Sequence, residues 1–148
     1  MKQKIFPTTY LLVALILMVL LHLLLPLRKS VFSMWQLIGL IPLAFGIGIN
    51  LAADKALRVA GTTVKPFQES TTLVTNSVYS FSRHPMYLGF VLVLIGIAIL
   101  LGSLTPWIVI PIFATLMEVV FIQVEERMLE GKFGEGWLEY KKKVRRWI

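Results

Sequence analysis

The chain has 148 residues, of which 57% are hydrophobic and only 16% are charged, and its formal net charge is +7. In a soluble domain of this length, about a quarter of the residues are charged, so the composition excludes a soluble domain. It indicates a single membrane domain over residues 1–148. The lack of cysteine excludes disulfides and thiolate ligands, and the two histidines are too far apart in sequence to favour a metal site.

Four apolar segments predict an all-α membrane protein with about four transmembrane helices, since each approaches the ~20 residues that cross hydrocarbon. In chain order they are Thr8–Leu27, Val31–Ala53, Met86–Leu101 and Thr105–Val124. The first is too long for a signal-peptide core and lacks a cleavage site, so we interpret it as a retained span. Turns are expected at Leu25–Ser30 and at Gly102–Pro106, and the second turn joins the last two spans into a hairpin.

The basic residues predict the orientation. With four crossings, the N-terminus, the Asp54–Arg83 loop and the C-terminal tail share one side, and only Arg28 and Lys29 of the 15 basic residues lie opposite. The positive-inside rule makes the shared side cytoplasmic, and we expect the inner membrane of a bacterium. Anionic lipid headgroups, not nucleic acid, are the partner that this charge favours.

Two cytoplasmic segments have recognisable patterns. In the loop, Thr62–Pro66 and Thr71–Thr75 are rich in threonine and valine, which predicts extended pieces. In the tail, aromatic and basic residues alternate from Phe133 onward, which predicts an amphipathic helix on the membrane surface.

The polar run Arg83–Gly89 stands where the loop enters the third span. Arg, His and Tyr can bind a polar or anionic small molecule, Pro85 suits a first helical turn, and Gly89 admits a ligand or a second backbone. The alternative is a juxtamembrane anchor with a snorkelling arginine.

Three carboxylates mark the fourth span. Glu118 lies inside the apolar segment, where an acid indicates a site facing the bundle interior. Glu125 is seven residues further on and nearly on the same face of an α-helix, whereas Glu126 is about 100° further round. Acids late in a helix oppose its dipole, so we expect Arg83, His84 or a cationic ligand as their counterpart. A solvated helix end is the alternative for the pair.

The hairpin places both polar groups side by side, because one span begins where its antiparallel neighbour ends. We therefore expect a cytoplasmic pocket, open laterally to lipid, for a zwitterionic cosubstrate and an amphiphilic acceptor. Residues 54–148, which contain the last two spans, would form this pocket. Residues 1–53 would form the two N-terminal spans.

The chain resembles the isoprenylcysteine carboxyl methyltransferase and phospholipid methyltransferase family of membrane enzymes. The resemblance rests on Leu73–Tyr79, on Ser82–Gly89, on Glu125–Leu129 and on Phe133–Glu135 with Trp137 and Tyr140. Two positions depart from it: Ser77 replaces a common glycine, and Ile122 replaces an arginine of the isoprenylcysteine enzymes.

The resemblance implies S-adenosylmethionine as methyl donor, leaving S-adenosylhomocysteine, and no metal. It implies that the cofactor-binding residues are Thr71, Thr72, Leu73, Val74, Tyr79, Arg83, His84, Pro85, Met86, Tyr87, Gly89, Glu125 and Glu126. The carboxylates would also favour the positive sulfonium. No GxGxxG follows a strand, so a soluble nucleotide fold is not expected.

The hypothesis is in-line methyl transfer to a lipid-like acceptor, most simply a carboxylate such as that of isoprenylcysteine. A carboxylate needs no base, since it is ionised at neutral pH, whereas a phospholipid amine would need His84, Glu125 or Glu118, the three candidate catalytic residues. The alternatives are a phospholipid amine N-methyltransferase, a membrane reductase with a nicotinamide cofactor, and a non-catalytic scaffold with the same pocket.

Overall fold

The computed structural model describes residues 6–27, 34–62 and 71–148, and the regular structure in these ranges is helical. This confirms the predicted all-α class. The elements are α1 (Pro7–Leu24), η1 (Met34–Gly39), α2 (Leu40–Val59), η2 (Ser77–Ser80), α3 (Pro85–Leu101), η3 (Thr105–Ile108), α4 (Val109–Met117), η4 (Glu118–Ile122), α5 (Gln123–Phe133) and α6 (Glu135–Lys143).

Among the described residues, three continuous helices are long and apolar enough to cross a membrane: Pro7–Leu24, Met34–Val59 and Thr105–Phe133. The fourth apolar helix, α3, is shorter at 17 residues. The helices continue to Val59 and Phe133, beyond the apolar segments predicted to end at Ala53 and Val124, because charged residues end an apolar segment without ending the helix. The start of the second span at Val31 lies outside the described residues.

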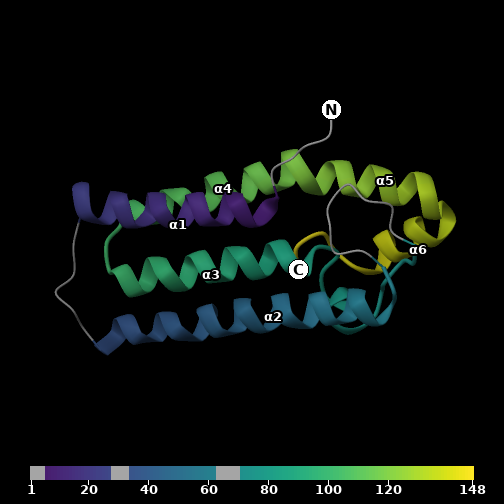
Figure 1. Ribbon diagram of the computed structural model, residues 1–148, viewed down its shortest axis with the longest axis horizontal. Coiled ribbons are helices and arrows are strands. Elements are labelled where there is room, and N and C mark those ends of the chain that lie inside the picture. The colour runs from purple at the N-terminus through teal and green to yellow at the C-terminus, as the bar shows by residue number, and fades with distance from the viewer. Residues whose placement is uncertain (1–5, 28–33, 63–70) are drawn as a thin grey trace.

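The long helices run alongside one another, α1 next to α4 and α2 next to α3 (Figure 1). The start of α1, the end of α2, the start of α3, and both α5 and α6 gather at one end of the bundle, which we call the polar end. The shared side predicted from four crossings is therefore confirmed for these segments. Lys2, Lys4, Arg28, Lys29 and Lys65 lie outside the described residues.

Helices α2 and α3 touch backbone to backbone along a glycine seam formed by Gly39, Gly46, Gly89 and Gly96. A Cβ added at Gly46 would stand 2.5 Å from the carbonyl oxygen of Gly89, and one at Gly39 would stand 2.5 Å from that of Gly96. Any side chain here would separate the helices. Close approach of small residues replaces the hydrophobic effect as the source of association within lipid.

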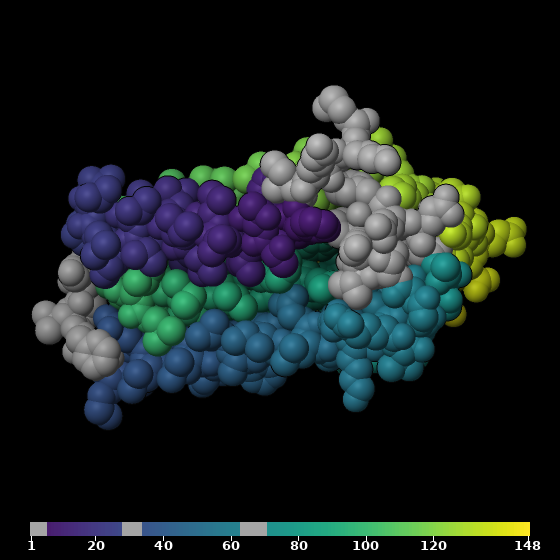
Figure 2. Space-filling model, viewed as in Figure 1, coloured from purple at the N-terminus to yellow at the C-terminus, as the bar shows by residue number. Residues whose placement is uncertain are grey.

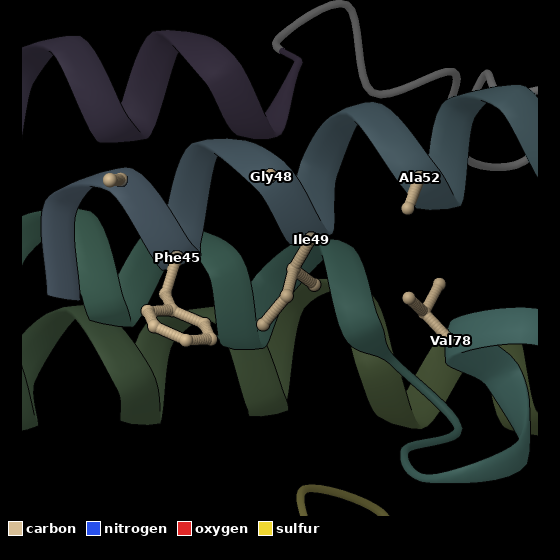
Figure 3. A pocket seen from close by; sticks show the side chains of 6 residues that line it. Phe45, Gly48, Ile49, Ala52 and Val78 are labelled. Carbon is tan, nitrogen blue, oxygen red and sulfur yellow. The ribbon is translucent and has the colours of Figure 1, made fainter. Parts of the chain in front are cut away.

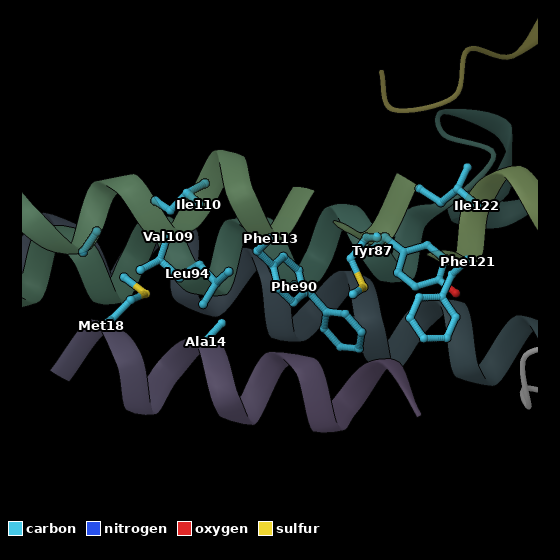
Figure 4. Packing of buried hydrophobic residues seen from close by; sticks show 12 residues of the cluster. Ala14, Met18, Tyr87, Phe90, Leu94, Val109, Ile110, Phe113, Phe121 and Ile122 are labelled. Carbon is cyan, nitrogen blue, oxygen red and sulfur yellow. The ribbon is translucent and has the colours of Figure 1, made fainter. Parts of the chain in front are cut away.

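The core lies between α1, α3 and α4 (Figure 4). Met18, Leu94 and Met117 are fully buried in it, and Phe113 and Phe121 fill the space along the same line. At the far end, Gly102 ends α3 with a positive φ of 66°, which confirms the predicted hairpin turn.

The outer surfaces are apolar, as lipid requires. On the face shown in Figure 2, α1 and α2 lie on either side of α3. Exposed leucines and phenylalanines cover both, including Leu24 and Phe45. A shallow apolar groove of about 390 Å³ follows the outer side of α2 (Figure 3) and is lined by Ala44, Phe45, Gly48, Ile49, Ala52 and Val78.

Candidate active site

The start of α3 fixes the first half of the site. His84 is the N-cap residue and Pro85 the first helical residue, where a missing N–H costs nothing. The His84 backbone N–H donates to Ser82 Oγ at 3.2 Å. The backbone of His84 is therefore fixed by Ser82 before it and by the first turn of α3 after it. Both His84 and Ser82 are buried.

The imidazole of His84 meets the two carboxylates predicted to face it. Its Nε2 lies 3.3 Å from Glu126 Oε1, and its Nδ1 lies 3.6 Å from Glu125 Oε2. Burial acts to lower the pKa of His84, but the hydrogen bonds with Glu125 and Glu126 outweigh it and raise that pKa above its ordinary value. The structure therefore brings the start of α3 against two carboxylates that lie within the continuous helix Thr105–Phe133, not at its end as predicted.

Tyr87 and Arg83 complete the contacts from α3. The Tyr87 hydroxyl donates to Glu125 Oε1 at 2.7 Å. Arg83 Nη1 lies 3.2 Å from Glu126 Oε1, and its guanidinium sits 5.7 Å from the ring centroid of Trp137. The Arg83 side chain is only 8% exposed, yet its Nε and Nη1 groups donate no hydrogen bond to any residue that the structure describes.

The register of the fourth span differs from the prediction. Glu118–Ile122 forms a π-helical turn, η4, which accommodates one extra residue. Residues eight apart across such a turn align as residues seven apart do in an α-helix. Glu118 consequently shares its face with Glu126, not with Glu125 as a regular helix would require.

Arg146 joins these two acids. Its Nη1 donates to Glu118 Oε1 at 2.6 Å, while its Nη2 and Nε donate to Glu126 Oε2 and Oε1 at 2.7 and 3.1 Å. The prediction expected the cation only from Arg83, His84 or a ligand. It missed Arg146, because the sequence shows it only as one more basic residue in the tail.

The C-terminal segment is what delivers Arg146. It runs back from α6 to the start of α3 (Figure 1), where the Arg83 N–H donates to the Arg145 carbonyl at 3.0 Å and Ser82 Oγ donates to the Arg146 carbonyl at 3.1 Å. Trp147 packs against the apolar core. The amphipathic helix predicted from Phe133 onward is α6, but it ends at Lys143, before Trp147, and its Trp137 and Tyr140 are buried within the protein. Its place on the membrane surface stays a prediction.

The structure places the remaining candidate residues in several different settings. The Tyr79 carbonyl accepts from the Tyr140 hydroxyl at 2.6 Å, and burial together with the charge of Glu125 raises the pKa of Tyr79. Leu73 packs against Trp137 and Tyr140, whereas Gly89 faces the glycine seam. The other four occupy varied settings: Thr71 bonded to the Gly61 carbonyl and Thr62 Oγ1, Thr72 exposed, Val74 and Met86 half-buried.

No strand forms at Thr71–Thr75, where Thr71 and Thr72 are bent, and Thr63–Pro66 lies outside the described residues. Ser77 adopts a φ of +57°, a left-handed conformation that explains why glycine is common at this position in the family it resembles.

Apolar spans and a charged cluster at one end define a multi-pass membrane protein with a buried polar site. Residues 34–136 match the family described as phospholipid methyltransferase, and the chain belongs to this family of membrane methyltransferases.

Three relatives illustrate the match. The chain is 35% identical over 114 residues to the protein-S-isoprenylcysteine O-methyltransferase of Xenopus laevis, covering 74% of this chain and 38% of that protein. It is 44% identical over 85 residues to the protein of the same name from Saccharomyces cerevisiae, covering 55% and 34%. It is 40% identical over 63 residues to an uncharacterized protein of Haemophilus influenzae, covering 43% of this chain and 100% of that protein.

The chain thus spans less than two fifths of the length of the two methyltransferases. No solved structure matches it.

Proposed function

We propose that this protein is an S-adenosylmethionine-dependent methyltransferase that methylates an oxygen, most simply a carboxylate, of a lipid-like acceptor. One observation carries the proposal: His84, at the start of α3, lies between Glu125 and Glu126 of α5 at 3.6 and 3.3 Å. The family match and the O-methyltransferase names of two relatives support the same reaction.

The donor set fits this methyl donor. Within the part of the chain that the structure describes, the buried Arg83 Nε has no acceptor and Nη1 contacts Glu126 only as an ion pair, which leaves donor capacity suited to the carboxylate of an amino acid. Glu125 is less enclosed than Glu126, at 21% against 7% exposed, and its charge suits a positive sulfonium or an ammonium group. When bound, the donor supplies a methyl group on positively charged sulfur.

The residues of the chain would contribute mainly orientation. Glu126 is engaged by Arg83, His84 and Arg146, so it holds the cations in place and is not free to act as a base. Tyr87 fixes Glu125 through its hydroxyl. A carboxylate acceptor needs no deprotonation, so proximity and alignment supply most of the rate.

We place the polar end in the cytoplasm. The described basic residues at the end of α2 (Lys55 and Arg58), before α3 (Arg83) and in the tail belong to this end, and cytoplasmic loops carry an excess of lysine and arginine. A bacterial inner membrane with anionic lipid headgroups suits this arrangement.

Calorimetric titration of the purified protein in phosphatidylcholine nanodiscs tests the donor. S-Adenosylmethionine and S-adenosylhomocysteine should bind, and NADPH should not. His84→Ala should abolish donor binding, and Tyr87→Phe should weaken it several-fold, since each removes a contact to Glu125. Glu130→Ala is the matched control, because Glu130 is exposed and its ion pair among the described residues is a long one, 3.6 Å from Lys141.

Transfer of labelled methyl into a lipid extract then identifies the product. A methylamine product that is stable to base would show that the acceptor is a phospholipid amine and not a carboxylate. Binding of NADPH alone would indicate a reductase, and binding of neither ligand would indicate a scaffold; either result overturns the proposal.

A further inference from the structure

Arg146 holds its two carboxylates unequally. It grips Glu126 with two nitrogens and Glu118 with one. The Glu126 side chain is 7% exposed, whereas those of Arg146 and Glu118 are 32% and 34% exposed. One side of the guanidinium is therefore anchored inside the protein, and the other is open to the surroundings.

The position of Arg146 does not depend on Glu118. Its backbone is fixed by Ser82, the preceding carbonyl is fixed by the N–H of Arg83, and Trp147 packs on the core immediately after it. Two-point binding to Glu126 sets the plane of the guanidinium. Loss of the Glu118 contact would leave a charged donor group in place and accessible.

The open side of Arg146 adjoins the proposed active site. Arg146 Nε and His84 Nε2 both contact the same oxygen, Glu126 Oε1, at 3.1 and 3.3 Å. A group bound to Arg146 would therefore be separated from the His84 imidazole by the carboxylate of Glu126 alone. Glu118 itself lies in η4, further into the same apolar helix than Glu126.

We propose that Arg146 is the residue that selects the acceptor, and that it binds an anionic headgroup, a carboxylate or phosphate, in the place that Glu118 holds. This rests on the proposed methyltransferase function and names the class of its acceptor. Glu118 is then an exchangeable ligand of the guanidinium, and Arg146 a specificity-determining residue.

The charges support exchange by an anion. Replacing one carboxylate on Nη1 by another keeps the guanidinium paired, and the displaced Glu118 is already one-third exposed. A neutral headgroup would bind Arg146 Nη1 more weakly than the Glu118 carboxylate does, so it would not displace Glu118. A cationic headgroup would face the positive charges of Arg146 and Arg83.

The test uses the full chain in phosphatidylcholine nanodiscs and three dibrominated lipids with the same alkyl chain: a carboxylate, a phosphate monoester and an alcohol. Quenching of tryptophan fluorescence, to which Trp147 contributes from beside Arg146, reports binding. At least one anion should bind about tenfold more tightly than the alcohol, since a charge-assisted hydrogen bond contributes this much. The tighter of the two identifies the headgroup.

Four variants separate recognition from structure. Arg146→Gln should abolish the preference for the anion while leaving binding of the alcohol unchanged, and Arg146→Lys should retain part of it. Glu118→Gln should tighten binding of the anion several-fold, because it removes the competing carboxylate. Arg145→Gln is the matched control, since it removes the same charge from an exposed neighbour.

Equal binding of all three lipids overturns the inference. So does equal weakening of anion and alcohol in Arg146→Gln, or weaker anion binding in Glu118→Gln. Donor titration in the same nanodiscs keeps the two proposals apart. Loss of anion preference with donor binding intact would remove only this inference, and the reverse result would remove only the proposed methyl donor.

Discussion

The glycine seam and the polar end hold the same helix, α3, by opposite means. Along the seam, Gly46 and Gly89 press backbone against backbone with no side chain between them. At the polar end, His84 is held by the carboxylates of α5 and the helix pair is joined by charge. Close packing is independent of pH and ligand, whereas an ion-pair cluster depends on both.

This contrast indicates a division of labour within one helix. The seam provides a fixed support, and the cluster provides groups that can change partner. Disrupting each in turn should therefore give different signatures, ranked here by the size of the expected effect.

Breaking the cluster should cost most. Glu126→Gln leaves Arg83, His84 and Arg146 without their shared buried carboxylate, and we expect the free energy of unfolding to fall by about 3 kcal/mol. Thermal unfolding in detergent measures it. The control Glu130→Gln, at an exposed pair, should change stability by less than about 0.5 kcal/mol; equal losses in both variants would contradict the cluster.

Widening the seam should come next. Gly46→Leu forces a side chain against the Gly89 carbonyl and should lower stability by about 2 kcal/mol at every pH. Gly48→Leu on the same helix adds the same atoms where nothing lies within 4 Å, and should stay within about 0.5 kcal/mol of the native protein. A larger loss in Gly48→Leu would show that the seam is misplaced.

The pH dependence distinguishes the two regions directly. Since the pKa of His84 is raised in the folded protein, its stabilising contribution is complete below about pH 6.5, the unfolded value, and is lost as pH rises through the folded pKa. Unfolding curves between pH 6 and 9 should show stability falling toward alkaline pH. His84→Gln should flatten that slope, while Gly46→Leu should leave it unchanged.

The smallest effect lies in the loop that leads to the site. Ser77→Gly relieves a left-handed backbone and should raise stability by up to about 1 kcal/mol, and the bond from Ser80 Oγ to the carbonyl of residue 77 is retained. Ser77→Val should lower it, because a β-branched residue is strained at positive φ. Identical melting temperatures for both variants would exclude strain at this position.

Much of the fold could be predicted because it depends on composition and on short motifs. Apolar length gave the spans, Gly102 gave the hairpin turn, and Pro85 gave the start of α3. The hairpin then made the meeting of His84 with Glu125 and Glu126 a matter of connectivity. These inferences require no knowledge of how side chains pack.

The rest depended on features that spacing does not reveal. The π-helical turn η4 changed the partner of Glu118 from Glu125 to Glu126, and periodicity assumed a regular helix. Arg146 reaches the site only because the chain reverses after α6 and pairs with Ser82 and Arg83. Long-range pairing of a single basic residue has no signature in one sequence.

The glycine seam also fixes the position of His84 along the length of α2. Gly89 is on the same helix as His84, so its contact with Gly46 determines how far along α2 the imidazole stands. Two glycine contacts in register oppose sliding of one helix past the other. A thinner or thicker bilayer would therefore tilt α2 and α3 as a unit, and the cluster around His84 would keep its height relative to both helices whatever the lipid.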